Sequence, residues 1–231
     1  NSLIAMYSIF NNLVILNESA EVVPDLAESW DFSADGTQIT FKMHTGVKFT
    51  DGTPVNAQAV KFTYDRYQDK DAKGGGAGAN RRASQLSLLK SVAVVDDSTI
   101  RFTLAEPFRP FLAIISERAG MILSPTALRK DAFKFESKPV GSGPYMITRW
   151  MPDSTMVMEK NPNYWNPKEQ YLDRIQIYQA IDPAVMFAMA RTGEADIVES
   201  IRVQDLSIAK SNPKLKIAEN FGARYEVIIM R

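Results

Sequence analysis

The chain has 231 residues and a mass of 25.8 kDa, enough to bury roughly 70% of the surface that its unfolded form would expose. Lysine plus arginine and aspartate plus glutamate both total 27, so the formal net charge is zero and no basic block indicates nucleic-acid binding. The absence of cysteine excludes disulfides and thiolate metal sites, and no apolar run is long enough to span a bilayer.

The first 30 residues predict a helix, a short strand at residues 13–16 and a turn that begins at Pro24. A hairpin follows. Trp30 and Phe32 share one face of its first strand, Asp35-Gly36 supplies the turn, and alternate apolar residues mark the return strand: Ile39, Phe41 and Met43.

A second turn at Asp51-Gly52 precedes a helix capped by Asn56. Val60, Tyr64 and Tyr67 recur on this helix at the spacing of one buried face. Another hairpin spans residues 92–104, with its turn at residues 96–98, and Pro110 opens an apolar helix over residues 111–117.

Strands alternate with helices in the last third. Residues 155–158 and 175–178 predict strands, and a helix begins at the Asp182 cap and ends at Gly193. Another helix is predicted near residues 204–210. The apolar run over residues 225–231 predicts a strand, for which we expect an unpaired edge.

Several of these segments resemble one family. Residues 22–66 are similar, nearly position by position, to the signature of the family 5 extracytoplasmic solute-binding proteins, the peptide, nickel and glutathione receptors of ABC importers. Three later motifs fall in the family's order: PVGSGPY at residues 139–145, NPNYW at 161–165 and RTGEADI at 191–197.

The resemblance implies an α/β fold: a periplasmic-binding-protein-like (class II) lobe with a mixed β-sheet and an inserted β-rich subdomain. Residues 1–30 and 138–231 would form the mixed-sheet core of lobe I, and residues 31–137 the insertion. Members of the family are much longer, so we interpret the chain as the first of two lobes, with the second lobe absent from this chain.

The implied function is that of a solute-binding subunit that captures a small solute outside the cytoplasm and delivers it to the membrane permease of an ABC importer. The solute would be a peptide, a glutathione-like molecule or a metal chelate, and the protein would be periplasmic or lipid-anchored outside the membrane. A solute-sensing domain of a regulatory protein is the alternative. The resemblance places the main anchors of a peptide in the second lobe, so we expect weak binding by this chain alone.

The residues themselves give no support for an enzyme, a cofactor or a metal site. His44 is the only histidine, and its strand parity predicts a solvent-facing imidazole. No serine lies in a nucleophile elbow, and the glycine cluster at residues 74–78 lacks the context of a phosphate-binding loop. A hydrolase is therefore the weaker alternative.

The candidate ligand-binding residues lie in three segments that, in the relatives, reach the cleft between the lobes. Arg82 and Arg118 offer guanidinium groups suited to a carboxylate, although exposed, solvated arginines are more common. Tyr7, one helical turn after Leu3, could line the cleft or pack in the core. The complete set of expected ligand-binding residues is Leu3, Tyr7, Arg82, Gln85, Arg118 and Ala119.

Overall fold

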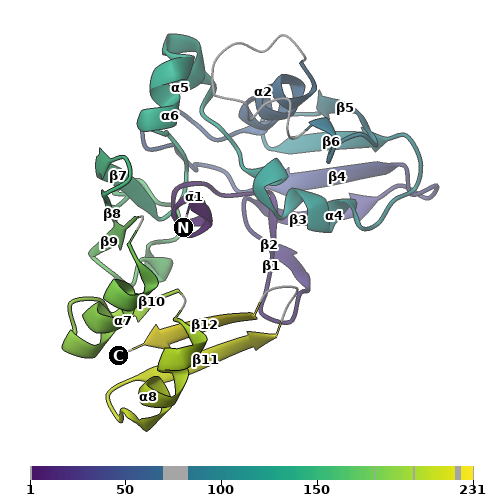
Figure 1. Cartoon of the computed structure of the whole chain (residues 1–231). Coiled ribbons are helices and arrows are strands. Elements are labelled where there is room, and N and C mark those ends of the chain that lie inside the picture. The colour runs from purple at the N-terminus through teal and green to yellow at the C-terminus, as the bar shows by residue number, and fades with distance from the viewer. Residues whose placement is uncertain (1, 70–82, 180, 200, 222–224, 231) are drawn as a thin grey trace. The chain divides into compact units, whose positions relative to one another are not determined.

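The computed structural model describes residues 2–69, 83–179, 181–199, 201–221 and 225–230, with the side chains of residues 2–4, 133, 134, 136 and 219–230 outside the description (Figure 1). The chain divides into two compact units. Unit 1 comprises residues 1–151 and 155–177, and unit 2 comprises residues 152–154 and 178–231. The predicted division at residues 30 and 138 stays a prediction.

Unit 1 begins with α1 (Ser2–Ile9) and a small antiparallel pair, β1 (Val14–Leu16) and β2 (Val22–Pro24). The predicted hairpin is confirmed as β3 (Ala27–Phe32) and β4 (Gln38–Met43), joined through Gly36, whose φ of 69° is left-handed. With β5 (Leu89–Val94) and β6 (Thr99–Leu104) they form an antiparallel sheet in the order β3-β4-β6-β5.

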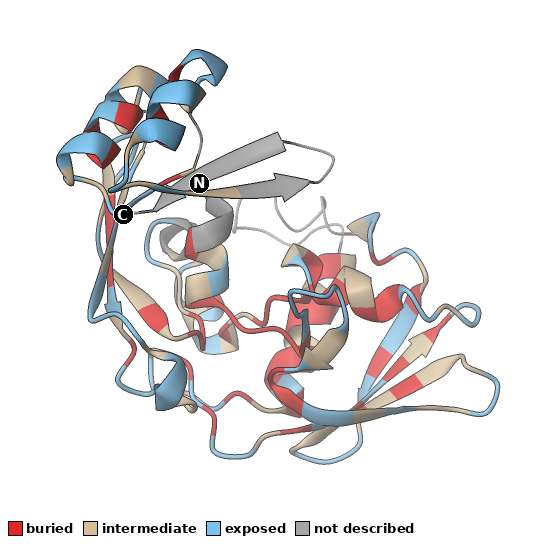
Figure 2. Ribbon diagram, turned by 90° about the horizontal axis from the view of Figure 1, so that it is seen from below, coloured by how far each residue is buried: buried red, intermediate tan, exposed pale blue. Residues whose placement is uncertain are grey.

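Helix α2 (Ala57–Gln68) packs on β5 and β6 of this sheet (Figure 1). The predicted cap is confirmed, since the Asn56 side chain accepts a hydrogen bond from the Ala59 N–H at 3.1 Å. The rings of Tyr64 and Phe41 pack edge-on against Phe102, with centroids 4.7 and 5.2 Å away. These aromatic contacts lie at the centre of the main core, and Figure 2 shows buried residues gathered on the sheet and the helices against it.

The remaining elements of unit 1 follow α4 (Phe111–Ile115). They are two short 3-10 helices, η1 (Arg118–Gly120) and η2 (Pro167–Glu169), helices α5 (Pro125–Lys130) and α6 (Ala132–Ser137), and strands β7 (Tyr145–Met151), β8 (Thr155–Lys160) and β9 (Arg174–Tyr178). The sheet β7-β8-β9 and α1 share a second core, to which Ile9, Phe10, Tyr145 and Met158 contribute.

Unit 2 contains α7 (Pro183–Thr192), β10 (Ile197–Val198), η3 (Val203–Asp205), α8 (Leu206–Ser211), β11 (Lys216–Phe221) and β12 (Tyr225–Met230). Asp182 caps α7 by accepting a hydrogen bond from the Ala184 N–H, and Gly193 ends it with a φ of 83°, both as predicted. Its small core includes Phe187, Ala190 and Ala209.

The unit 2 sheet has the order β10-β12-β11, so β12 lies at its centre. It pairs along its whole length with β11 and, at residues 229–230, with β10. The expectation of an unpaired edge over residues 225–230 is therefore wrong for the side of β12 that faces β11. It is also wrong for residues 229–230 on the side that faces β10. Strand pairs with a described register are antiparallel throughout the described chain.

Candidate functional site

A pocket of about 430 Å³ lies within unit 1, where α1, β1, the end of α4 and the loop before η2 meet. We call it the Asp25 pocket. Its lining combines three acidic side chains, several amide and hydroxyl groups, and an apolar wall: Tyr7, Phe10, Asn11, Asn12, Ile15, Leu16, Asp25, Ser116, Glu117, Pro144, Tyr164 and Glu169.

Asp25 links the segments of the pocket. Its carboxylate accepts hydrogen bonds from the Asn12 backbone N–H and the Asn11 side-chain amide, both at 2.8 Å. The Asn12 side-chain amide in turn donates to the backbone carbonyls of Ile115, at 3.2 Å, and Glu117, at 2.9 Å. The chain before β1, the bend after β2 and the end of α4 are thereby fixed to one another.

Burial dominates the electrostatics of Asp25, which is 8% exposed. Desolvation raises the pKa of its carboxyl from 3.8 to about 7, against the lowering effect of the hydrogen bonds from Asn12 and Asn11. The nearby charge of Glu169 makes a smaller contribution to the same rise. Asp25 therefore exchanges a proton near neutral pH, where an ordinary aspartate is fully ionised.

Tyr164 carries a second perturbed group at the same pocket. Burial raises the pKa of its phenol, and the neighbouring charges of Glu169 and Asp25 raise it further, while a hydrogen bond from Asn11 lowers it. The phenol stays protonated and donates to the Glu169 carboxylate at 3.2 Å. Across the pocket, the Tyr7 hydroxyl donates to the Glu117 carboxylate at 2.6 Å.

Two buried oxygen atoms in the pocket lining have no hydrogen-bond partner among the described residues. They are the side-chain carbonyl oxygens of Asn11 and Asn12, which are 7% and 1% exposed as residues. An unpaired buried acceptor costs about 1–3 kcal/mol. These two oxygens are not accessible from the pocket, but the three carboxylates of its lining are acceptors when ionised, so a group with several N–H donors suits it chemically.

The family-like motifs position this pocket and do not themselves supply most of its lining. In the PVGSGPY segment, a Cβ at Gly141 or Gly143 would lie 2.1 or 2.5 Å from the Ile9 carbonyl group. Only glycine permits this approach, which lets the Gly143 N–H donate to the Ile9 carbonyl at 2.8 Å and close the end of α1.

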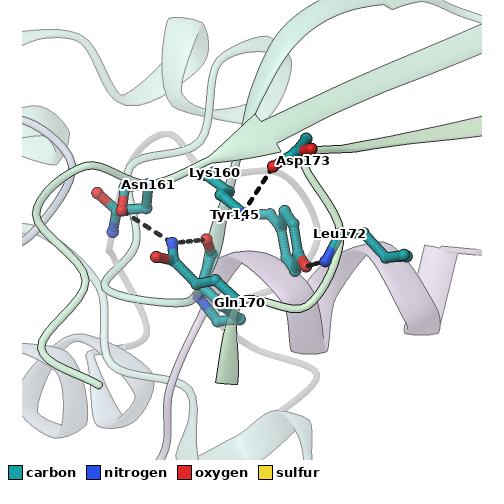
Figure 3. Close-up of polar contacts among 7 residues, drawn as sticks. Tyr145, Lys160, Asn161, Gln170, Leu172 and Asp173 are labelled. Carbon is teal, nitrogen blue, oxygen red and sulfur yellow. Dashed lines mark hydrogen bonds and ion pairs between the residues drawn. The ribbon is translucent and has the colours of Figure 1, made fainter. Parts of the chain in front are cut away.

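The NPNYW segment is tied to the same loop. The Asn161 side chain donates to the Gly143 carbonyl at 2.9 Å. Gln170 then donates to the carbonyls of Pro144, at 2.6 Å, and Asn161, at 2.9 Å (Figure 3).

Two contacts hold the far end of this loop. The Tyr145 hydroxyl accepts from the Leu172 N–H at 3.0 Å, and Lys160 pairs with Asp173 at 2.7 Å (Figure 3). Together with the Gln170 contacts they hold the loop that presents Tyr164 and Glu169 to the pocket.

The structure brings together two of the segments expected to bind ligand. Tyr7 lines the Asp25 pocket, and Glu117, the neighbour of Arg118, lies opposite it. Arg118 itself is half-buried in η1 and does not line the pocket, and Ala119 is buried in the main core. Gln85 is exposed in a turn, whereas the Leu3 side chain, all of Arg82 and the glycine cluster lie outside the described residues.

Sequence reasoning did not single out the other polar groups of the pocket, Asn11, Asn12, Asp25, Glu117, Tyr164 and Glu169. Asp25 does lie inside the family-like stretch of residues 22–66, and Tyr164 lies inside the NPNYW motif. A charged residue that is buried inside a motif would have indicated a functional role. Burial, however, is known only once the fold is known.

A second pocket, of about 400 Å³, lies between α2 and the start of α5. None of the predicted site residues lines it, and its charged groups are already engaged. Lys61 pairs with Asp65 at 2.7 Å, and the Arg129 guanidinium lies 5.0 Å above the Phe62 ring. This pocket therefore offers less to a ligand than the Asp25 pocket.

The prediction that the His44 imidazole faces solvent is wrong. Its side chain is 32% exposed, stacks on Trp165 with ring centroids 4.5 Å apart, and lies 3.3 Å from the Glu28 carboxylate. It follows the last residue of β4, so strand parity no longer fixes its direction. Among the described residues, no three histidine, aspartate or glutamate side chains form a group that could hold a metal ion.

The described helices include none with the length and apolar character needed to cross a membrane.

Comparison with known proteins gives a consistent result. Residues 21–231 match the sequence model of the bacterial extracellular solute-binding proteins, family 5. The glutathione-binding protein GsiB of Pectobacterium atrosepticum is 30% identical over 223 residues, which are 96% of this chain and 42% of that protein.

Solved structures agree. The ABC transporter-associated periplasmic binding protein DppA from Helicobacter pylori, in complex with the peptide STSA, superposes with a TM-score of 0.85 at 31% identity, over 94% of this chain and 46% of that one. The dipeptide-binding protein from Pseudoalteromonas sp. SM9913, in complex with Met-Leu, gives a TM-score of 0.84 at 26% identity, over 95% and 46%.

The chain thus spans less than half of the length of these relatives. The expected periplasmic-binding-protein-like fold class and the extracytoplasmic location are confirmed. The chain belongs to the bacterial extracellular solute-binding proteins of family 5.

Proposed function

We propose that this chain is the first lobe of a receptor that captures a peptide or similar small solute outside the cytoplasm and delivers it to an ABC permease. The observation that carries the proposal is the Asp25 pocket, which two of the expected ligand-binding segments line, in a chain of this family. Relatives named for glutathione and for peptides support a small solute with peptide-like groups.

The receptor would act without catalysis. Its single histidine is stacked on Trp165 and does not line the Asp25 pocket, and the chain has no cysteine. The Ser116 hydroxyl at the pocket donates to the Ala113 carbonyl at 2.8 Å, which leaves it without the adjacent base that activates a nucleophilic serine. Binding energy would instead favour closure of the two lobes on the solute.

A thermal-shift screen of the complete protein that carries this chain tests the proposal. The panel contains short peptides, glutathione, nickel chelates and opine-like acids. A ligand at a hundred times its Kd adds about 2.7 kcal/mol to the free energy of unfolding and raises the midpoint by several degrees.

A shift with peptides or glutathione supports the receptor and identifies its class of cargo. A flat response across the whole panel contradicts a peptide-type receptor. Release of amino acids from the same peptides during incubation would contradict the absence of catalysis.

A further inference from the structure

We propose that the Asp25 pocket is a subsite for a lysine-like arm of the solute, an alkyl chain that ends in a primary ammonium group. This inference rests on the proposed function and names a chemical feature of its cargo. It differs from the carboxylate recognition by arginine that the sequence suggested for Arg82 and Arg118.

The charges of the lining favour a cation. Asp25, Glu117 and Glu169 come from three separate segments, and the described lining contains no lysine, arginine or histidine. Opposite charges within about 4–6 Å stabilise one another strongly where water is partly excluded. A carboxylate in this pocket would meet only like charges.

The hydrogen-bonding groups favour the same ligand. An ammonium group has three N–H donors and no acceptor. The carboxylates of Glu117 and Glu169 line the pocket, and each has acceptor capacity beyond the one tyrosine hydroxyl from which it accepts. The hydroxyls of Tyr7 and Tyr164 already donate, to Glu117 and Glu169, so their hydrogens are committed to carboxylates.

The apolar part of the lining suits the stem of such an arm. Phe10, Ile15, Leu16 and Pro144 form this wall, and Ile15 and Leu16 remain 37% and 36% exposed. A methylene stem laid along exposed apolar side chains removes apolar surface of both from water, which favours binding. The volume of about 430 Å³ leaves room for the arm.

A cation beside Asp25 has a second consequence. It favours the ionised carboxylate, so binding releases a proton wherever Asp25 is protonated in the free protein. The groups that face Asp25 are the Asn12 N–H, the Asn11 amide, the Glu169 charge and the protonated Tyr164 phenol, and none of them is cationic. Binding is therefore expected to be several-fold weaker at pH 5.5 than at pH 8.

Two probes with the same stem test the subsite on this chain, pentylammonium chloride and pentan-1-ol. The readout is the set of side-chain amide signals of ¹⁵N-labelled asparagine, in which Asn11 and Asn12 report on the pocket. Pentylammonium should shift both signals saturably, with a Kd on the order of 1 mM for so small a ligand, and pentan-1-ol should not.

Variants sharpen the test. Glu117→Gln removes one charge from an exposed side chain and should weaken pentylammonium binding at least several-fold without unfolding the protein. Asp35→Asn removes one charge outside the pocket and should leave binding unchanged. Equal shifts with both probes, no shift with either, or unchanged binding by Glu117→Gln would each overturn the proposal.

A companion measurement separates this inference from the proposed function. The complete protein is titrated with the tripeptide Ala-Lys-Ala and with its norleucine counterpart, which lacks the ammonium group. Preference for the lysine peptide supports both. Tight, equal binding of the two peptides keeps the receptor and overturns the subsite, whereas pentylammonium binding without any peptide binding keeps the subsite and contradicts the peptide receptor.

Discussion

The native protein is expected to lose stability as the pH rises from 4 to 7, and the Asp25→Asn variant is expected not to show this loss. The carboxyl is 8% exposed and has a pKa of about 7 in the folded protein, against 3.8 for an ordinary aspartate. Its folded form therefore binds a proton more tightly than its unfolded form does. The stabilisation is fully present below pH 3.8 and is lost as the pH rises to about 7.

The size of the effect follows from the two pKa values. Each pH unit between them changes the free energy of unfolding by up to 1.36 kcal/mol, so the total is roughly 4 kcal/mol. Asparagine keeps the neutral form at every pH. When the Asn11 side-chain amide turns over, the new amide at position 25 donates to the Asn11 carbonyl oxygen, which is unpaired among the described residues of the native protein. The oxygen of the new amide accepts from the Asn12 N–H, as the carboxylate does.

Urea unfolding followed by tryptophan fluorescence provides the assay. All three tryptophans, Trp30, Trp150 and Trp165, belong to unit 1, so the signal reports on the unit that contains Asp25. The difference in unfolding free energy between native protein and variant, measured at several pH values from 4 to 8, isolates the titration of this one carboxyl.

Asp35→Asn is the matched control. Asp35 is exposed, and hydrogen bonds from Ser33 and Thr37 lower the pKa of its carboxyl to about 2. Its contribution is present above pH 3.8 and is lost as the pH falls through 2, so it should be constant from pH 4 to 8. A flat difference curve for Asp25→Asn, or one that rises with pH, would refute the reasoning.

Three further predictions concern packing and capping. Gly143→Ala should lower the free energy of unfolding by about 3 kcal/mol or more, because its Cβ would lie 2.5 Å from the Ile9 carbonyl carbon. Gly46→Ala, with a φ of 78° but open space around it, should cost only about 1 kcal/mol, so equal thermal midpoints for the two variants would contradict the close approach. Tyr64→Phe should stabilise the protein by about 1 kcal/mol, since the buried hydroxyl has no hydrogen-bond partner in the described part of the chain, and a lower midpoint would mean that the hydroxyl is satisfied. Asp182→Ala should destabilise α7 by about 1 kcal/mol and speed amide exchange there, with exchange in α2 unchanged; uniform acceleration would argue against a local cap.

Much of the local structure could be predicted because its causes are local. The Asp35-Gly36 turn and the alternation of Ile39, Phe41 and Met43 specify a hairpin independently of its tertiary contacts. Asn56 and Asp182 likewise cap helices through backbone N–H groups two or three residues away. The burial of Tyr64 and Tyr67 followed from their spacing on one helix face.

The pocket could not be predicted in the same way, because its groups meet only through tertiary contacts. Tyr7 and Glu117 are 110 residues apart, and Asn12 and the Ile115 carbonyl are 103 residues apart. The same limit explains the error at His44, whose stacking partner Trp165 comes from a distant loop. Residue type indicated guanidinium groups at Arg82 and Arg118, which stays a prediction, and it did not indicate the three carboxylates that line the Asp25 pocket.

The central position of β12 has a consequence for synthesis of the chain. Unit 1, which ends at residue 177, can complete its own sheets while the ribosome is still adding residues. Unit 2 cannot, because in the described sheet β12 lies between β10 and β11, and its residues 225–230 are translated after both neighbours. Until β12 is translated, α7 and α8 have no complete sheet to pack on. We therefore expect the nascent chain to contain a folded unit 1 and a unit 2 that is not yet folded.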